Sequence, residues 1–174
     1  MMHVVTGGSG SGKSVYAEEW LLEQETGPYL YVATMIPYGE ESQIKIQKHR
    51  MQRRGKGFDT KECYRDMKSM DVPDNRGILL ECVSNLLANE LYTEEGIMNA
   101  PEDVRKKVIE GIIHLKDCTS RLAVVTNEIH SDVQDYSDET KTYIRLLGQI
   151  NQELASMADK VTEVVYGIPL QIKG

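Results

Sequence analysis

A glycine-rich run near the N-terminus carries the residue types that phosphate chemistry needs. It reads Gly-Gly-Ser-Gly-Ser-Gly-Lys-Ser, which fits the pattern G-x-x-x-x-G-K-S. Glycines let successive backbone N–H groups converge on an anion. The lysine of the pattern reaches the β- and γ-phosphates, and its last hydroxyl binds Mg²⁺. We therefore expect a nucleoside triphosphate and its Mg²⁺ to be bound by Gly7, Gly8, Ser9, Gly10, Ser11, Gly12, Lys13 and Ser14.

The flanks of this run support the same interpretation. His3-Val4-Val5 is a short β-type run, and residues 16–21 carry apolar side chains at helical spacing. A strand, a glycine-rich loop and a helix N-terminus in this order form an anion site. A flexible Gly/Ser linker would need neither the Lys-Ser pair nor these flanks.

A carboxylate at the end of an apolar run is the second candidate for chemistry. Glu81 follows Ile78-Leu79-Leu80, which is typical of a buried parallel strand. Such a strand delivers its last residue to the edge of the sheet where ligands bind in open α/β folds. An acid in this place supports Mg²⁺ in enzymes with a phosphate loop. We predict that Glu81 joins Ser14 at the metal, with an ordinary strand-end carboxylate as the alternative.

A histidine among cations is the third candidate. His49 lies in a polar helical segment, and Arg50, Arg53 and Arg54 follow closely. Neighbouring cations lower the pKa of an imidazole and favour its neutral form. A neutral imidazole can attack phosphorus and form a covalent intermediate. A solvated surface side chain is the alternative, and the local composition alone leaves both open.

Length and composition limit the class of protein. The 174 residues suit one domain spanning residues 1–174. The net charge of −7 argues against a nucleic-acid-binding surface. No apolar run approaches the roughly 20 residues that a membrane span needs, and the N-terminal residues lack the features of a signal peptide. The cysteines are odd in number and form no C-x-x-C pair, so we expect reduced thiols and a cytoplasmic protein.

Apolar β-type runs alternate with helical runs along the chain, which predicts an α/β fold. Continuous apolar strands favour a buried, mostly parallel sheet flanked by helices, as in P-loop NTPases. We expect strands at residues 3–5, 29–33, 78–80, 122–126, 161–166 and 170–172, the last two forming a C-terminal β-hairpin. We expect helices after the phosphate loop and at residues 41–54, 84–91, 101–115 and 138–157, and loops at 55–57, 96–100 and 132–138.

A set of short motifs follows in order along nearly the whole chain. Beyond the phosphate loop, which many NTPases share, it comprises Tyr31-Val32-Ala33-Thr34, Ile46-Gln47-Lys48-His49, Gly57-Phe58-Asp59-Thr60-Lys61-Glu62, Leu79-Leu80-Glu81-Cys82, Val125-Thr126-Asn127-Glu128, Gly148-Gln149-Ile150-Asn151-Gln152 and Gly167-Ile168-Pro169. In this ordered set the chain resembles the bifunctional adenosylcobinamide kinase / adenosylcobinamide-phosphate guanylyltransferase family of cobalamin biosynthesis.

The resemblance implies two reactions. First, a nucleoside triphosphate, ATP or GTP, phosphorylates the hydroxyl of the aminopropanol arm of adenosylcobinamide. Then GTP transfers GMP to that phosphate through a guanylyl-histidine, which by position is His49, giving adenosylcobinamide-GDP and pyrophosphate. The family is trimeric, so the resemblance also implies a homo-oligomer that acts on small molecules. It further implies nucleotide contacts from Thr34, Met35, Arg50, Arg53, Glu62 and Glu81.

The chain departs from the family pattern after Asn127-Glu128. The family usually continues V-G-x-G-I-V-P, whereas residues 129–135 read I-H-S-D-V-Q-D. The lost glycines restrict that loop. Further on, the Arg-Asp pair of an R-x-F-R-D pattern is missing from residues 141–145. His130 and Asp132 could form a metal or catalytic pair, although a solvated loop is favoured.

Two alternatives therefore stay open beside the bifunctional enzyme. One is a single-activity P-loop kinase for a small molecule. The other is a catalytically inactive nucleotide-binding sensor or partner module. The presence of Lys13, Ser14, His49 and Glu81 together argues against the inactive module.

Overall fold

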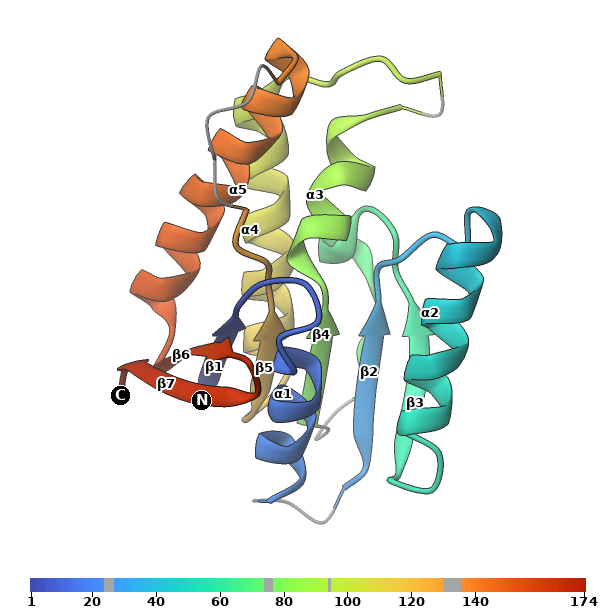
Figure 1. Ribbon diagram of the computed structural model, residues 1–174, viewed down its shortest axis with the longest axis vertical. Helices are drawn as coiled ribbons and strands as arrows, with labels where there is room; N and C mark the ends of the chain where they lie inside the picture. The colour runs from blue at the N-terminus through green and yellow to red at the C-terminus, as the bar shows by residue number, and fades with distance from the viewer. Residues whose placement is uncertain (24–26, 74–76, 94, 130–135) are drawn as a thin grey trace.

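A computed structural model describes residues 1–23, 27–73, 77–93, 95–129 and 136–174. Its centre is a seven-stranded sheet with the order β3-β2-β4-β5-β1-β6-β7 (Figure 1). Every neighbouring pair is parallel except β6 and β7, which form an antiparallel hairpin. The strands are β1 (Met2–Thr6), β2 (Tyr29–Ala33), β3 (Phe58–Glu62), β4 (Gly77–Glu81), β5 (Leu122–Val125), β6 (Lys160–Val165) and β7 (Ile168–Lys173).

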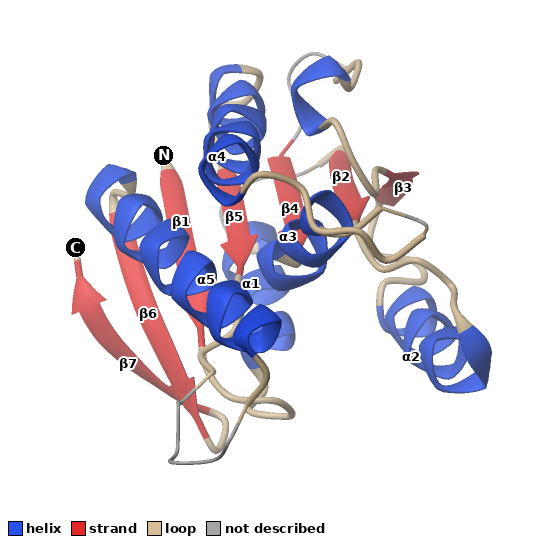
Figure 2. Cartoon of the chain, turned by 90° about the horizontal axis from the view of Figure 1, so that it is seen from above, coloured by secondary structure: helices blue, strands red, loops and turns tan. Residues whose placement is uncertain are grey.

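Helices cover both faces of the sheet (Figure 2). One face packs against α3, α4 and α5 in the larger apolar core, and the other packs against α1 in a smaller core. Alternate strand residues enter opposite cores, as the pleat of a strand requires. The helices are α1 (Lys13–Leu22), α2 (Gly39–Gln52), α3 (Val83–Leu91), α4 (Pro101–Asp117) and α5 (Asp138–Met157), with a short 3₁₀ helix η1 (Met67–Ser69).

The expected fold class is confirmed, including the parallel sheet, the flanking helices and the C-terminal hairpin. The structure adds β3, which the strand prediction omitted. This strand reads Phe-Asp-Thr-Lys-Glu and lies at the edge of the sheet with no fully buried residue, so it lacks an apolar run. The last strand begins at Ile168 rather than at Leu170, because an edge strand accommodates Pro169. Most of the predicted 132–138 loop lies outside the described residues.

Helix α2 differs from the others because none of its residues is buried. The segment after it holds it to the protein instead. Arg53 is 6 % exposed, and its guanidinium carbon lies 3.2 Å from the centroid of the Tyr31 ring. Lys56 forms an ion pair with the buried Glu18 of α1. The helix is therefore anchored mainly near its C-terminal end, close to His49.

A buried histidine on β1 makes stability depend on pH. His3 is 1 % exposed, its Nε2 lies 2.8 Å from Thr162 Oγ1, and the ring of Trp20 stands edge-on at 4.7 Å. Burial lowers the pKa of His3 to about 4, and the cations Lys160 and Arg121 add to this. Between the unfolded pKa of 6.5 and about 4, the unfolded chain therefore binds a proton that the folded chain does not.

We expect the free energy of unfolding to fall as the pH drops through this window. The loss attributable to His3 is about 2 kcal/mol between pH 7.5 and pH 5. Urea unfolding of the wild type and of His3→Gln at both pH values measures it, because glutamine does not titrate. An equal pH dependence in the two proteins would contradict the assignment.

Candidate active site

The phosphate loop connects β1 to α1 at the carboxyl edge of the sheet. Gly10 and Gly12 have φ values of 73° and 95°, and α1 begins at Lys13 directly after them. A Cβ on Gly7 would lie 2.4 Å from the backbone oxygen of Val164, so this position requires glycine. The N-cap residue of α1, Gly12, forms no side-chain cap hydrogen bond, and the first turn has no acidic residue, so this helix N-terminus suits an anion.

Lys13 is folded back over the loop. Its Nζ donates a hydrogen bond to the backbone oxygen of Gly8 at 2.9 Å, and the residue is 8 % exposed. Burial lowers the pKa of its ammonium group, while Cys82 and Glu81 oppose this. The cation thus lies within the loop that the sequence pattern assigns to the triphosphate, together with Ser9, Ser11 and the loop glycines.

Glu81 is the point where the candidate groups meet. It ends β4, beside Ala33 of β2, and so reaches the carboxyl edge as predicted. One carboxylate oxygen accepts a hydrogen bond from Ser14 Oγ. The other accepts one from the hydroxyl of Tyr31 at 3.1 Å and lies 3.5 Å from Nδ1 of His49. One side chain thus joins the phosphate loop to the candidate nucleophile.

Ser14 and Glu81 offer the oxygen ligands that Mg²⁺ prefers. Among the described residues, no group of three or more His, Cys, Asp or Glu side chains could hold a metal by itself. A hydroxyl and one carboxylate suit a Mg²⁺ ion whose other ligands are phosphate oxygens and water.

His49 opens into a pocket between α2 and the ends of β2, β3 and β4. Its side chain is 25 % exposed. The pocket has a cavity volume of about 50 Å³ and brings together both cationic and acidic side chains. Arg50 pairs with Glu62 at 3.1 Å across its rim. Of the predicted site residues, those that line this pocket are Met35, His49, Arg50, Arg53, Glu62 and Glu81.

Thr34 has a different place from these residues. It is fully buried, and its hydroxyl donates to the backbone oxygen of Cys82 and accepts from the backbone N–H of Cys82. Its own backbone oxygen accepts a hydrogen bond from Asn89 Nδ2 at 2.8 Å. The side chain of Thr34 therefore joins β2 to the end of β4 instead of pointing into the pocket.

Comparison with known proteins decides the family. A family model described as cobinamide kinase / cobinamide phosphate guanyltransferase matches residues 3–172. The chain belongs to this family. The bifunctional adenosylcobalamin biosynthesis protein CobU of Salmonella typhimurium is 32 % identical over 185 residues, covering 99 % of this chain and 100 % of the relative.

Other relatives agree with this result. CobU of Escherichia coli is 32 % identical over 184 residues, covering 99 % of this chain and 100 % of its own. CobP of Pseudomonas aeruginosa, with the same bifunctional description, is 26 % identical over 177 residues, covering 100 % of this chain and 98 % of its own. These matches do not favour the single-activity kinase or the inactive module.

A solved ATPase from a type III secretion system of pathogenic bacteria resembles the fold. Its TM-score is 0.55 at 11 % identity, and the match covers 98 % of this chain and 56 % of that one. At this identity the similarity concerns the fold alone, and it agrees with the P-loop class.

The departure from the CobU-family pattern is only partly visible. His130 and Asp132 lie outside the described residues. Tyr143, the aromatic that survives, donates its hydroxyl to the backbone oxygen of Ser84 at 3.0 Å. Burial raises the pKa of this phenol to about 12. It thus holds α5 against the start of α3.

Sequence reasoning missed the residues that hold the site in place. The sequence places Tyr31 in a strand and in one of the motifs of the resemblance but assigns it no role in the site, although its hydroxyl contacts Glu81 and the Arg53 guanidinium stacks on its ring. Burial and the Glu81 carboxylate raise the pKa of Tyr31, which keeps its hydroxyl a donor. The alternation of two tyrosines in β2 was an available signal, but it pointed to packing rather than to a polar contact.

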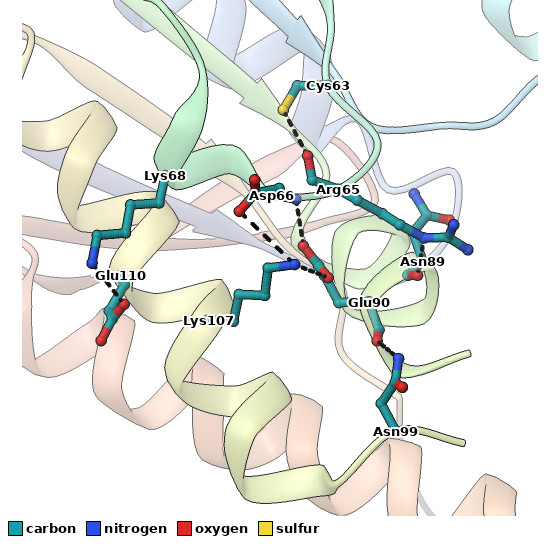
Figure 3. A network of polar contacts seen from close by, with 9 residues as sticks. All are labelled: Cys63, Arg65, Asp66, Lys68, Asn89, Glu90, Asn99, Lys107 and Glu110. Carbon is teal, nitrogen blue, oxygen red and sulfur yellow. Dashed lines mark hydrogen bonds and ion pairs between the residues drawn. The ribbon is translucent and has the colours of Figure 1, made fainter. Parts of the chain in front are cut away.

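The C-terminal end of α3 anchors the segments that follow β2 and β3. Asn89 Nδ2 donates to the backbone oxygens of both Thr34 and Tyr64, at 2.8 and 3.0 Å. The buried Glu90 accepts from the backbone N–H of Asp66 at 2.5 Å and pairs with Lys107 at 2.9 Å (Figure 3). Met35 directly follows the anchored Thr34, and Glu62 lies two residues before the anchored Tyr64. This network therefore positions two sides of the His49 pocket.

Within the described residues, no helix is long and apolar enough to cross a membrane.

Proposed function

We propose that this protein carries out both reactions of its family. It phosphorylates adenosylcobinamide with a nucleoside triphosphate, and it then transfers GMP from GTP to the adenosylcobinamide phosphate through a guanylyl-histidine at His49. The observation that carries the proposal is the meeting of Ser14 and His49 at the single carboxylate of Glu81. Because one carboxylate contacts both the phosphate-binding loop and the nucleophile, a single site can carry out both phosphate-transfer reactions.

The kinase step uses the phosphate loop. The loop amides and Lys13 bind the β- and γ-phosphates of ATP or GTP. Ser14 and Glu81 would hold Mg²⁺, which would neutralise phosphate charge. The corrinoid hydroxyl oxygen forms a bond to the γ-phosphorus, and the bond from that phosphorus to the β-bridging oxygen breaks. The nucleoside diphosphate leaves, and the hydroxyl proton passes to solvent.

The guanylyl step uses His49. Its Nδ1 faces Glu81 at 3.5 Å, which leaves Nε2 as the attacking atom. Nε2 bonds to the α-phosphorus of GTP as the α–β bridging bond breaks, and pyrophosphate leaves. An oxygen of the corrinoid phosphate then attacks the same phosphorus, and the P–N bond breaks. Arg50 and Arg53, which line the pocket, stabilise the charge on the transferring group.

The test follows label from GTP to protein. The protein is incubated with Mg²⁺ and α-labelled GTP and then denatured, and we expect acid-labile, base-stable label on the chain. An absence of label near neutral pH would remove the guanylyl half of the proposal. Turnover of ATP that depends on added cobinamide tests the kinase half separately.

We also propose that the chain forms one domain and works in the cytoplasm as a homo-oligomer, a trimer as in its family. Its substrates are small molecules and not nucleic acid, in keeping with the net charge of −7. Light scattering combined with size-exclusion chromatography measures the oligomer, and a monomer at micromolar concentration would contradict it.

The anchor at Asn89 leads to a prediction for the guanylyl step. Asn89→Asp replaces the amide donor by a carboxylate that faces the carbonyls of Thr34 and Tyr64. Loss of buried hydrogen bonds costs about 1–3 kcal/mol, so we expect the KM for GTP in guanylylation to rise about tenfold. Initial rates over a range of GTP concentrations measure this, and the kinase rate should change less.

Asn99→Asp is the matched control. Asn99 Nδ2 donates to the backbone oxygen of Glu90 in the same network, but it contacts neither anchored segment (Figure 3). We expect its KM for GTP to stay close to that of the wild type. If both variants raise KM equally, the effect is a general loss of stability and Asn89 has no special positioning role.

A further inference from the structure

The C-terminal hairpin touches the phosphate loop. Strand β6 runs parallel to β1, with Thr6 opposite Glu163, so the turn after β6 lies at the same sheet edge as the loop (Figure 2). The backbone N–H of Gly167 in this turn donates to the backbone oxygen of Ser11 at 2.8 Å. A Cβ on Gly12 would lie 3.5 Å from the Cα of Gly167. The turn therefore rests directly on the backbone of the loop.

Tyr166 is an unusual residue for this turn. The two turn residues, Tyr166 and Gly167, have φ values of 51° and 80°. Two-residue turns of this kind favour Asn-Gly, because asparagine tolerates positive φ far better than a bulky side chain does. Tyr166 is also 95 % exposed, so its ring is not buried in a core. The exposed ring adds little to the stability of the fold, and its backbone conformation is unfavourable for tyrosine. We therefore expect a functional role for this side chain.

The direction of a bound nucleotide brings its base toward this turn. Ser14 and Glu81, the proposed Mg²⁺ ligands, set the terminal phosphates on the β4 side of β1. The hairpin lies on the opposite side, since β6 and β7 follow β1 in the sheet order. An extended nucleotide that points its terminal phosphates toward Glu81 therefore directs its nucleoside end toward the hairpin.

We propose that Tyr166 forms a stacking surface for the purine base of the nucleoside triphosphate bound at the phosphate loop. The inference rests on the proposed function, because it needs a triphosphate at the loop. An aromatic face binds the face of a base and is tolerant of its identity. Tyr166 therefore supports adenine and guanine alike, and it strengthens binding of the phosphate donor without selecting between ATP and GTP.

The test compares a nucleotide with a ligand that has no base. Calorimetry measures the binding of Mg²⁺-ATP and of inorganic tripolyphosphate to the wild type, Tyr166→Asn and Tyr166→Phe. Tyr166→Asn removes the ring and introduces the residue that the turn favours, so its melting temperature should equal or exceed that of the wild type. Tyr166→Phe keeps the ring.

We expect Tyr166→Asn to weaken Mg²⁺-ATP binding about 5- to 30-fold and to leave tripolyphosphate binding unchanged. Tyr166→Phe should bind ATP within about twofold of the wild type. Unchanged ATP affinity in Tyr166→Asn would overturn the stacking role. Equal weakening of ATP and tripolyphosphate would overturn it too, because the turn would then act through the loop. A wild type that binds neither ligand would instead refute the phosphate-loop assignment, and the stacking role with it.

Discussion

His49→Ala is expected to reduce the amount of label that the protein takes up from α-labelled GTP at least about 1,000-fold relative to the wild type. The reason is that no other group replaces an imidazole nitrogen as the atom that bonds to phosphorus. Cobinamide-dependent ATP turnover should remain within about threefold of the wild type, since His49 is not part of the phosphate loop. Autoradiography of denatured protein and a coupled ADP assay measure the two reactions.

His114→Ala is the matched control for this variant. His114 lies on α4, where its Nε2 is 2.8 Å from the backbone oxygen of Met70, far from the pocket residues in sequence and in the fold. We expect full labelling of this variant. Persistent label in His49→Ala would show that another residue carries the GMP, and loss of label in both variants would point to unfolding.

Glu81→Gln is expected to slow both reactions, by about 100-fold or more. Glutamine keeps one acceptor oxygen, which serves either Ser14 or Tyr31, and it removes the negative charge that supports Mg²⁺ and faces His49. Glu81→Gln should slow both ATP turnover and protein labelling, whereas His49→Ala should abolish labelling only. Rates of ATP turnover and of protein labelling, each measured over a range of Mg²⁺ concentrations, check the prediction.

Glu110→Gln controls for the change of charge. Glu110 is a half-exposed residue on α4 that pairs with Lys68 at 3.1 Å, away from the pocket. It should leave both rates within about twofold of the wild type, as surface substitutions usually do. If Glu81→Gln impaired only one of the two reactions, the shared role of this carboxylate would be wrong.

The elements with strong local patterns could be predicted closely from the sequence. The strand at 29–33 and the helix at 138–157 agree with β2 and α5 to the residue, because their hydrophobic pattern and boundaries are local. Strand β3 was not predicted, because an edge strand with polar side chains has no apolar run. The hairpin was expected, but its turn is only two residues long, since Pro169 can join an edge strand.

The sequence by itself determined the phosphate loop, the α/β class and the candidate roles of Glu81 and His49, because each depends on residue types at short spacing. Only the tertiary structure decided that Ser14 and His49 share one carboxylate, that Asn89 holds the carbonyls of Thr34 and Tyr64, and that the Tyr166 turn rests on the loop. These contacts join residues distant in the chain. Their geometry depends on the order of strands in the sheet and on how the helices pack across it, which no local pattern encodes.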